Sequence, residues 1–224
     1  MQNEAMHIKA VVFHLEGTLI EPHKHDATSI KGPKPASDAA TALGYLRSKN
    51  IRLAIISHGR LTSVQKNLTD SSIISISDFD TVISREQLKA KSRNINAVAL
   101  AAQKMNLPLH HVMVVAAEPA ILQDARNFGA LTVFFDPLAQ SEKTRVGTDF
   151  HITRLIELKS IVRQCIPLPP GKLPNDLLRE YLNQFVFDDP SILINPGVGE
   201  DTAAIDIRSE EVLVLKSDPI TFAT

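Results

Sequence analysis

The feature that most constrains the fold is a series of five short apolar runs, each too brief for a helix and each followed by a polar or small residue. Such runs, rich in β-branched residues, are typical of strands that are buried on both faces of a parallel sheet. We therefore expect strands at residues 8–13, 51–56, 79–83, 111–115 and 131–135.

The segments between these runs carry apolar residues at helical spacing, as Ala39, Leu43 and Leu46 do. Alternating strands and helices predict an α/β fold, here a Rossmann-like three-layer parallel sheet with helices on both faces. Ligands of such sheets bind at the carboxyl ends of the strands, so candidate chemistry should lie there. The helices are expected at 37–49, 61–68, 94–105, 119–128 and 151–161.

Composition limits the classes of partner. The 224 residues carry a net charge of −1, so no basic excess points to nucleic acid or to an anionic membrane. The single cysteine, Cys165, excludes a disulfide framework and fits a reducing compartment. The N-terminal apolar run is too short for a signal sequence or a membrane span. We expect a soluble cytoplasmic protein.

A change in composition divides the chain. Residues 165–174 contain four prolines, which indicates a semi-rigid linker. We expect one domain at 1–163, a linker at 164–174 and a partial α+β tail at 175–224. In the tail we expect a helix at 175–187, a glycine-containing turn at 195–201 and a hairpin of strands 203–207 and 212–216.

The segment VVFHLEGTL, which ends the first expected strand, resembles the first motif of the haloacid-dehalogenase-like (HAD) phosphohydrolase superfamily. That motif is a strand followed by Asp-x-Asp-Gly-Thr-Leu, in which the first aspartate attacks phosphorus and the second is the general acid and base. The resemblance places His14 and Glu16 at the two aspartate positions, while Gly17, Thr18 and Leu19 match.

The remaining HAD motifs hold the phosphoryl group and a metal ion. Ser57 in LAIISHG matches the hydroxyl residue of the second motif, with His58 beside it. Lys91 is the best counterpart of the third-motif lysine, with Lys89 and Arg93 as rivals. The resemblance thus implies a phosphate-binding set of Gly17, Thr18, Ser57, His58 and Lys91.

The fourth motif should supply aspartates that bind Mg²⁺, but it falls on Ala116, Ala117 and Ile121, and Glu118 is the only carboxylate nearby. Mg²⁺ prefers oxygen ligands, so the loss of these aspartates argues against Mg²⁺ in this site. The resemblance covers about residues 7–160. Within it the segments that carry caps in the family are short, which implies a minimal cap and an open site.

Each site residue has two interpretations. His14 is a phosphoryl acceptor or a polar remnant of a lost site. Glu16 is a general acid and base or a carboxylate held by amides of the Gly17-Thr18 turn. Ser57 and Lys91 retain what is needed to bind an anion.

Other polar residues suggest less chemistry. His23, His25 and Asp26 could hold a transition metal, although a solvated loop is the simpler interpretation. The His110-His111 pair begins an expected strand and is interpreted as a surface pair, and Cys165 as a structural thiol.

The tail resembles the N-terminal start of the AIR-synthase-like superfamily, through LPPGKLPNDLLREYL, NPGVGEDTAAID and LVLKSDPITFAT. Those enzymes bind ATP with magnesium. The resemblance implies Asp201 and Asp218 as metal ligands, and ATP as a cofactor, if the domain is complete. Isolated strands here would pair with a protein partner or with a second copy of the chain.

Three hypotheses follow. The first is a pseudo-phosphatase, a catalytically impaired HAD-like regulatory module fused to the start of an ATP-binding domain. The second is an active phosphatase that uses Glu16, His14, Ser57 and Lys91 on a phosphorylated small molecule. The third is the N-terminal part of an ATP-dependent AIR-synthase-like enzyme.

Overall fold

A computed structural model describes most of the chain. The described residues are 7–21, 35–90, 96–139, 147–167, 173–185, 187–200, 202–207 and 211–216. The chain divides into two compact units, Met1–Pro167 and Leu168–Thr224, with the boundary inside the proline-rich segment.

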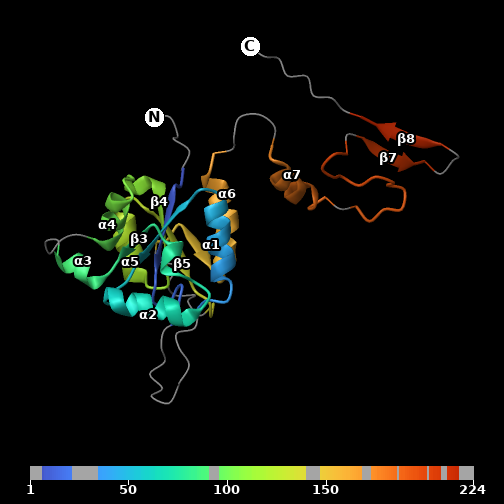
Figure 1. Ribbon diagram of the computed structural model, residues 1–224. Helices are drawn as coiled ribbons and strands as arrows, with labels where there is room; N and C mark the ends of the chain where they lie inside the picture. Colours follow the sequence, from blue (N-terminus) through green and yellow to red (C-terminus); the bar gives the residue numbers. More distant parts are fainter. Residues whose placement is uncertain are drawn as a thin grey trace, which may run out of the picture. The chain divides into compact units, whose positions relative to one another are not determined.

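The first unit contains a parallel sheet flanked by helices (Figure 1), and its six strands have the order β3-β2-β1-β4-β5-β6. This confirms the predicted α/β class. The chain adds strands first on one side of β1 and then, from β4, on the other, so the order reverses between β1 and β4. The strands are β1 (Ala10–His14), β2 (Arg52–Ile56), β3 (Thr81–Ile83), β4 (Val112–Ala116), β5 (Leu131–Phe135) and β6 (Phe150–Ile152).

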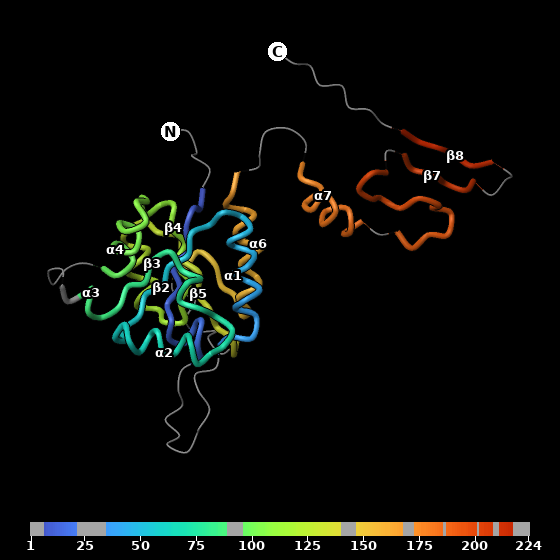
Figure 2. The backbone as a smooth tube through the Cα atoms, in the orientation of Figure 1, coloured from blue at the N-terminus to red at the C-terminus, as the bar shows by residue number. Residues whose placement is uncertain are grey.

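Strand β1 lies in the interior of the sheet, between β2 and β4 (Figure 2). Val11 and Phe13 pack into the core on one face, and Ala10 and Val12 into the core on the other. All four side chains are fully buried. Burial on both faces explains why this strand has a continuous apolar run instead of an alternating pattern.

Helices cover both faces of the sheet. Helices α1 (Ala39–Ser48), α2 (Leu61–Ser71) and α6 (Leu158–Cys165) contribute buried residues to one core. Helices α4 (Ala97–Lys104) and α5 (Pro119–Asn127) contribute to the other, against which Leu88 of the short helix α3 (Arg85–Ala90) also packs. Because all six strands are parallel, their carboxyl ends lie at one edge of the sheet.

The predicted helix at 151–161 is wrong at its start. Phe150–Ile152 forms β6, which pairs with β5, a short 3-10 turn covers Leu155–Glu157, and α6 begins only at Leu158. The carboxylate of Glu157 accepts hydrogen bonds from the amides of Thr153 and Arg154, which fixes the turn before the helix. An open edge of β5 was available to residues 150–152, and local sequence could not reveal it.

Smaller differences from the sequence predictions occur at three other elements. The strand expected from His111 begins at Val112, because Leu109–His111 forms a 3-10 turn. The short helix α3 was not predicted. The helix expected at 94–105 is present as α4, although residues 91–95 lie outside the described part of the chain.

The second unit contains helix α7 (Asn175–Leu182) and an antiparallel pair, β7 (Ala203–Asp206) and β8 (Val212–Leu215). The pair agrees with the expected hairpin, while the helix is shorter than the predicted 175–187. In the described residues, we find no helix with the length and apolar character needed to cross a membrane.

Candidate functional site

The polar residues predicted from the sequence meet where three neighbouring strands end. His14 is the last residue of β1, Ser57 and His58 follow β2, and Glu118 follows β4 as the residue before α5. Because β2, β1 and β4 are adjacent and parallel, their carboxyl ends lie at one edge, where ligands of such sheets bind.

His14 is buried, with 3% of its surface exposed. Its Nε2 atom lies 3.1 Å from Oε2 of Glu16, an ion-pair distance, but the contact is not aligned as a hydrogen bond. Both ring nitrogens are therefore without a hydrogen-bond partner among the described residues. The ring packs edge-to-face against His58, with centroids 5.4 Å apart.

Glu16 is held by side chains. The Ser57 hydroxyl donates a short hydrogen bond to its Oε1, and His14 contacts its Oε2. Burial raises the pKa of the Glu16 carboxyl, but the contacts from His14 and Ser57 lower it by more. The pKa of Glu16 therefore lies below the usual value. Glu16 is thus ionised at neutral pH. The Gly17 amide, considered above as a partner, donates to the Ile20 carbonyl instead.

The turn after β1 is built around Gly17 and Thr18. Gly17 has φ +75°, a left-handed conformation that favours glycine. The buried Thr18 hydroxyl accepts a hydrogen bond from the Ala117 amide at 3.0 Å, so it links the β1 turn to the end of β4. Thr18 therefore has a structural partner in this site.

Ser57 is also engaged. Its hydroxyl accepts a hydrogen bond from the Gly59 amide at 3.0 Å while donating to Glu16. An anion placed at Ser57 would compete with an ionised carboxylate for the same hydroxyl proton. Lys91 lies outside the described residues, so its predicted contribution to anion binding stays a prediction, as do those of Gly17, His58 and the other members of the set.

The residues present do not fit Mg²⁺. At the positions that the resemblance assigns to the fourth motif, Ala116 and Ile121 are buried apolar side chains, and Ala117 offers only a methyl group. The possible ligands close to one another at this edge are His14, His58 and Glu118. Two imidazoles and one carboxylate are a poor match to a hard cation that requires oxygen ligands.

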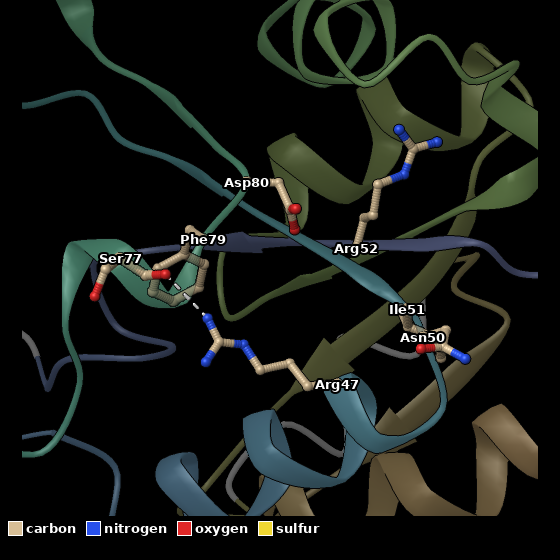
Figure 3. A pocket seen from close by; sticks show the side chains of 7 residues that line it. All are labelled: Arg47, Asn50, Ile51, Arg52, Ser77, Phe79 and Asp80. Atoms are coloured by element: carbon tan, nitrogen blue, oxygen red, sulfur yellow. Dashed lines mark hydrogen bonds between the residues drawn. The ribbon is translucent and has the colours of Figure 1, made fainter.

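A polar pocket lies at the opposite end of the sheet, beside the first residues of β2 and β3 (Figure 3). Arg47 donates hydrogen bonds to the Asp78 carboxylate and to the Ser77 carbonyl, and Asp80 accepts one from the Leu53 amide. These groups hold strand and helix ends together. The lining residues are Arg47, Asn50, Ile51, Arg52, Ser77, Phe79 and Asp80.

Comparison with known proteins supports the fold. No family model and no curated sequence matches the chain. Among solved structures, a dehalogenase with an intermediate complex aligns with TM-score 0.59 and 18% identity, over 69% of this chain and 97% of that one. This chain has a HAD fold.

Two further HAD structures support this assignment. A HAD phosphatase from Thermococcus onnurineus has TM-score 0.57 and 15% identity, over 69% of this chain and 98% of that chain. An L-2-haloacid dehalogenase from Xanthobacter autotrophicus, solved with chloropropionic acid covalently bound, has TM-score 0.57 and 18% identity, over 70% and 98%. Identities this low establish the shared HAD fold and no shared chemistry.

The sequence predicted most of this site but did not join its parts. His14, Glu16 and Ser57 were singled out, and the structure brings them into direct contact. The proximity of His14, His58 and Glu118 was missed. A signal existed, because each of the three ends or follows one of three strands that the HAD order makes neighbours. Asp201, Asp218, His23, His25 and Asp26 lie outside the described residues.

Proposed function

We propose that the HAD-fold unit is a pseudo-phosphatase, impaired in the aspartate-based phosphoryl transfer of the superfamily and serving as a regulatory or interaction module. The observation that carries the proposal is the buried His14 at the nucleophile position, in contact with Glu16 and beside apolar residues where metal ligands would be required. Phosphoryl transfer depends mainly on positioning and charge stabilisation. In this site both the position of the nucleophile and the charge stabilisation by a metal ion are changed.

The charge of the site adds support. Glu16 is ionised, and its Oε1 accepts the hydrogen bond that the Ser57 hydroxyl could otherwise donate to a phosphoryl oxygen. A phosphoryl group entering this site would meet the negative charge of Glu16. The described residues offer no set of ligands for a Mg²⁺ ion that would offset this charge. Binding of a phosphate ester in a reactive position is therefore disfavoured.

A second candidate, an active phosphatase with an altered site, rests on the His14–Glu16 pair. A carboxylate beside an imidazole can orient it and stabilise its charged form, and histidine can accept a phosphoryl group. In that case Glu16 would assist His14, and Ser57 would hold the phosphate.

Turnover of p-nitrophenyl phosphate with added Mg²⁺ separates the two candidates. We expect no turnover above a buffer blank for the wild-type chain. Turnover that is abolished by Glu16→Ala and retained by the control Asp124→Asn, an exposed carboxylate on α5, would overturn the pseudo-phosphatase proposal. As a gain-of-function test, His14→Asp combined with Glu16→Asp and Ala117→Asp should raise turnover if the missing carboxylates are the cause.

We further propose that the second unit is the start of an AIR-synthase-like domain that pairs with another polypeptide or a second copy. Each residue of β8 is exposed, including Val214 at 60%, although all four are apolar. A two-stranded sheet is marginal alone, and an uncovered strand is a template for pairing. Sedimentation analysis should show self-association that Val214→Lys weakens and that Lys159→Ala, on α6, does not. A monomer at all concentrations would refute pairing with a second copy.

A further inference from the structure

Three possible metal ligands converge at the carboxyl edge of the sheet. His14, His58 and Glu118 each offer a ligand atom, and these atoms all lie within 4.8 Å of one another. They come from the ends of β1, β2 and β4, which are neighbours in the sheet. Their proximity is thus set by the register of three parallel strands.

A second observation points to a ligand at this position. His14 is almost fully buried, yet in the described part of the chain its Nδ1 has no hydrogen-bond partner, and its Nε2 has only the ion-pair contact with Glu16. Buried polar groups in proteins are nearly always satisfied. Glu16 lies 3.1 Å from Nε2, where a carboxylate orients the ring in a carboxylate–histidine–metal arrangement, and we assign the unpartnered Nδ1 as the ligand atom.

We propose that His14, His58 and Glu118 bind a divalent transition-metal ion of the Zn²⁺ class. Imidazole nitrogen favours Zn²⁺, Co²⁺ and Ni²⁺ over Mg²⁺, and two histidines with one carboxylate leave a coordination position open. The two carboxylates, Glu118 in the ligand set and Glu16 behind His14, offset the double positive charge. The site differs from the oxygen-ligand site that the resemblance implies, in both its ligands and its metal.

The geometry requires only small side-chain movements. Ligand atoms at the usual Zn²⁺ distances stand roughly 3.4 Å apart in a tetrahedral site. Movements of about 1.4 Å or less are therefore sufficient. His58 and Glu118 are exposed and can move, while His14 is fixed in the core.

Isothermal titration of the full chain with Zn²⁺, repeated with Co²⁺ while recording visible absorption, tests the proposal. We expect one ion per chain and no competition from millimolar Mg²⁺. His58→Ala and Glu118→Gln change exposed residues and should leave the fold intact, yet each should weaken Zn²⁺ binding by at least about 100-fold, more than the loss of an outer-shell partner costs. Glu16→Gln should weaken it by about 10- to 100-fold as a positioning change.

A matched control is His110→Ala, since the exposed His110 lies against the ring of His111, with centroids 4.2 Å apart, and the pair could hold adventitious Zn²⁺. This variant should bind Zn²⁺ as the wild type does. The proposal fails if no Zn²⁺ binds, or if binding survives both His58→Ala and Glu118→Gln. It is independent of the pseudo-phosphatase proposal, because Zn²⁺ binding is measured without turnover and Mg²⁺-dependent turnover would not alter its outcome.

Discussion

Replacing Thr18 with valine should destabilise the HAD-fold unit without opening a cavity. Valine has nearly the same shape as threonine but removes the hydroxyl that accepts the Ala117 amide at 3.0 Å. Losing one partner leaves the other unsatisfied, which costs about 1–3 kcal/mol when it is buried. Because Ala117 is only half-buried, we expect the lower part of that range, about 1–2 kcal/mol.

Urea denaturation followed by circular dichroism measures this change. With a slope of about 2 kcal/mol per molar, the midpoint should fall by about 0.5–1 M. Thr18→Ser keeps the acceptor and loses one methyl group, so it should cost only about 0.8 kcal/mol. Thr69→Val, on the exposed face of α2, should change stability by less than about 0.5 kcal/mol. If Thr18→Val were as stable as the wild type, the proposed link between β1 and β4 would be refuted.

Three further predictions concern the same unit. Glu16 has a pKa below its unfolded value, so its contribution to stability is present above about pH 4.3 and is lost as the pH falls through the folded pKa. The difference in unfolding free energy between wild type and Glu16→Gln should therefore shrink in acid. A difference that stays constant across pH-dependent unfolding curves would contradict this. Gly17→Ala places a side chain on a left-handed backbone, whereas the new Cβ would lie 3.6 Å from the Ala117 Cβ, an ordinary contact. The strain comes from the backbone, so we expect a loss of about 1–2 kcal/mol in thermal unfolding. No loss would show that the turn relaxes freely. Cys165 is buried, and burial raises the pKa of its thiol, so it should react with a thiol reagent such as DTNB only when the unit unfolds; rapid reaction of the native protein would disprove its burial.

The sequence alone predicted the α/β class of the first unit and the first five strands of its sheet. Apolar runs such as residues 51–56 and 131–135 can be satisfied only by strands covered on both faces, and alternation with helices leaves a parallel sheet as the solution. The resemblance to the HAD motifs singled out His14, Glu16 and Ser57 as candidate site residues. The prediction of the α/β class succeeded because the hydrophobic pattern of each strand and helix is encoded locally along the chain.

Tertiary structure decided what local pattern could not. Residues 150–152 form a strand because β5 offers them an open edge, a long-range interaction that overrides their helical appearance. One carboxylate oxygen of Glu16 accepts from Ser57, 41 residues away, while the Gly17 amide that the sequence suggested as a partner bonds the Ile20 carbonyl. The grouping of His14, His58 and Glu118 likewise depends on three strands meeting at one edge, since residues distant in sequence become neighbours only when the register of the sheet is fixed.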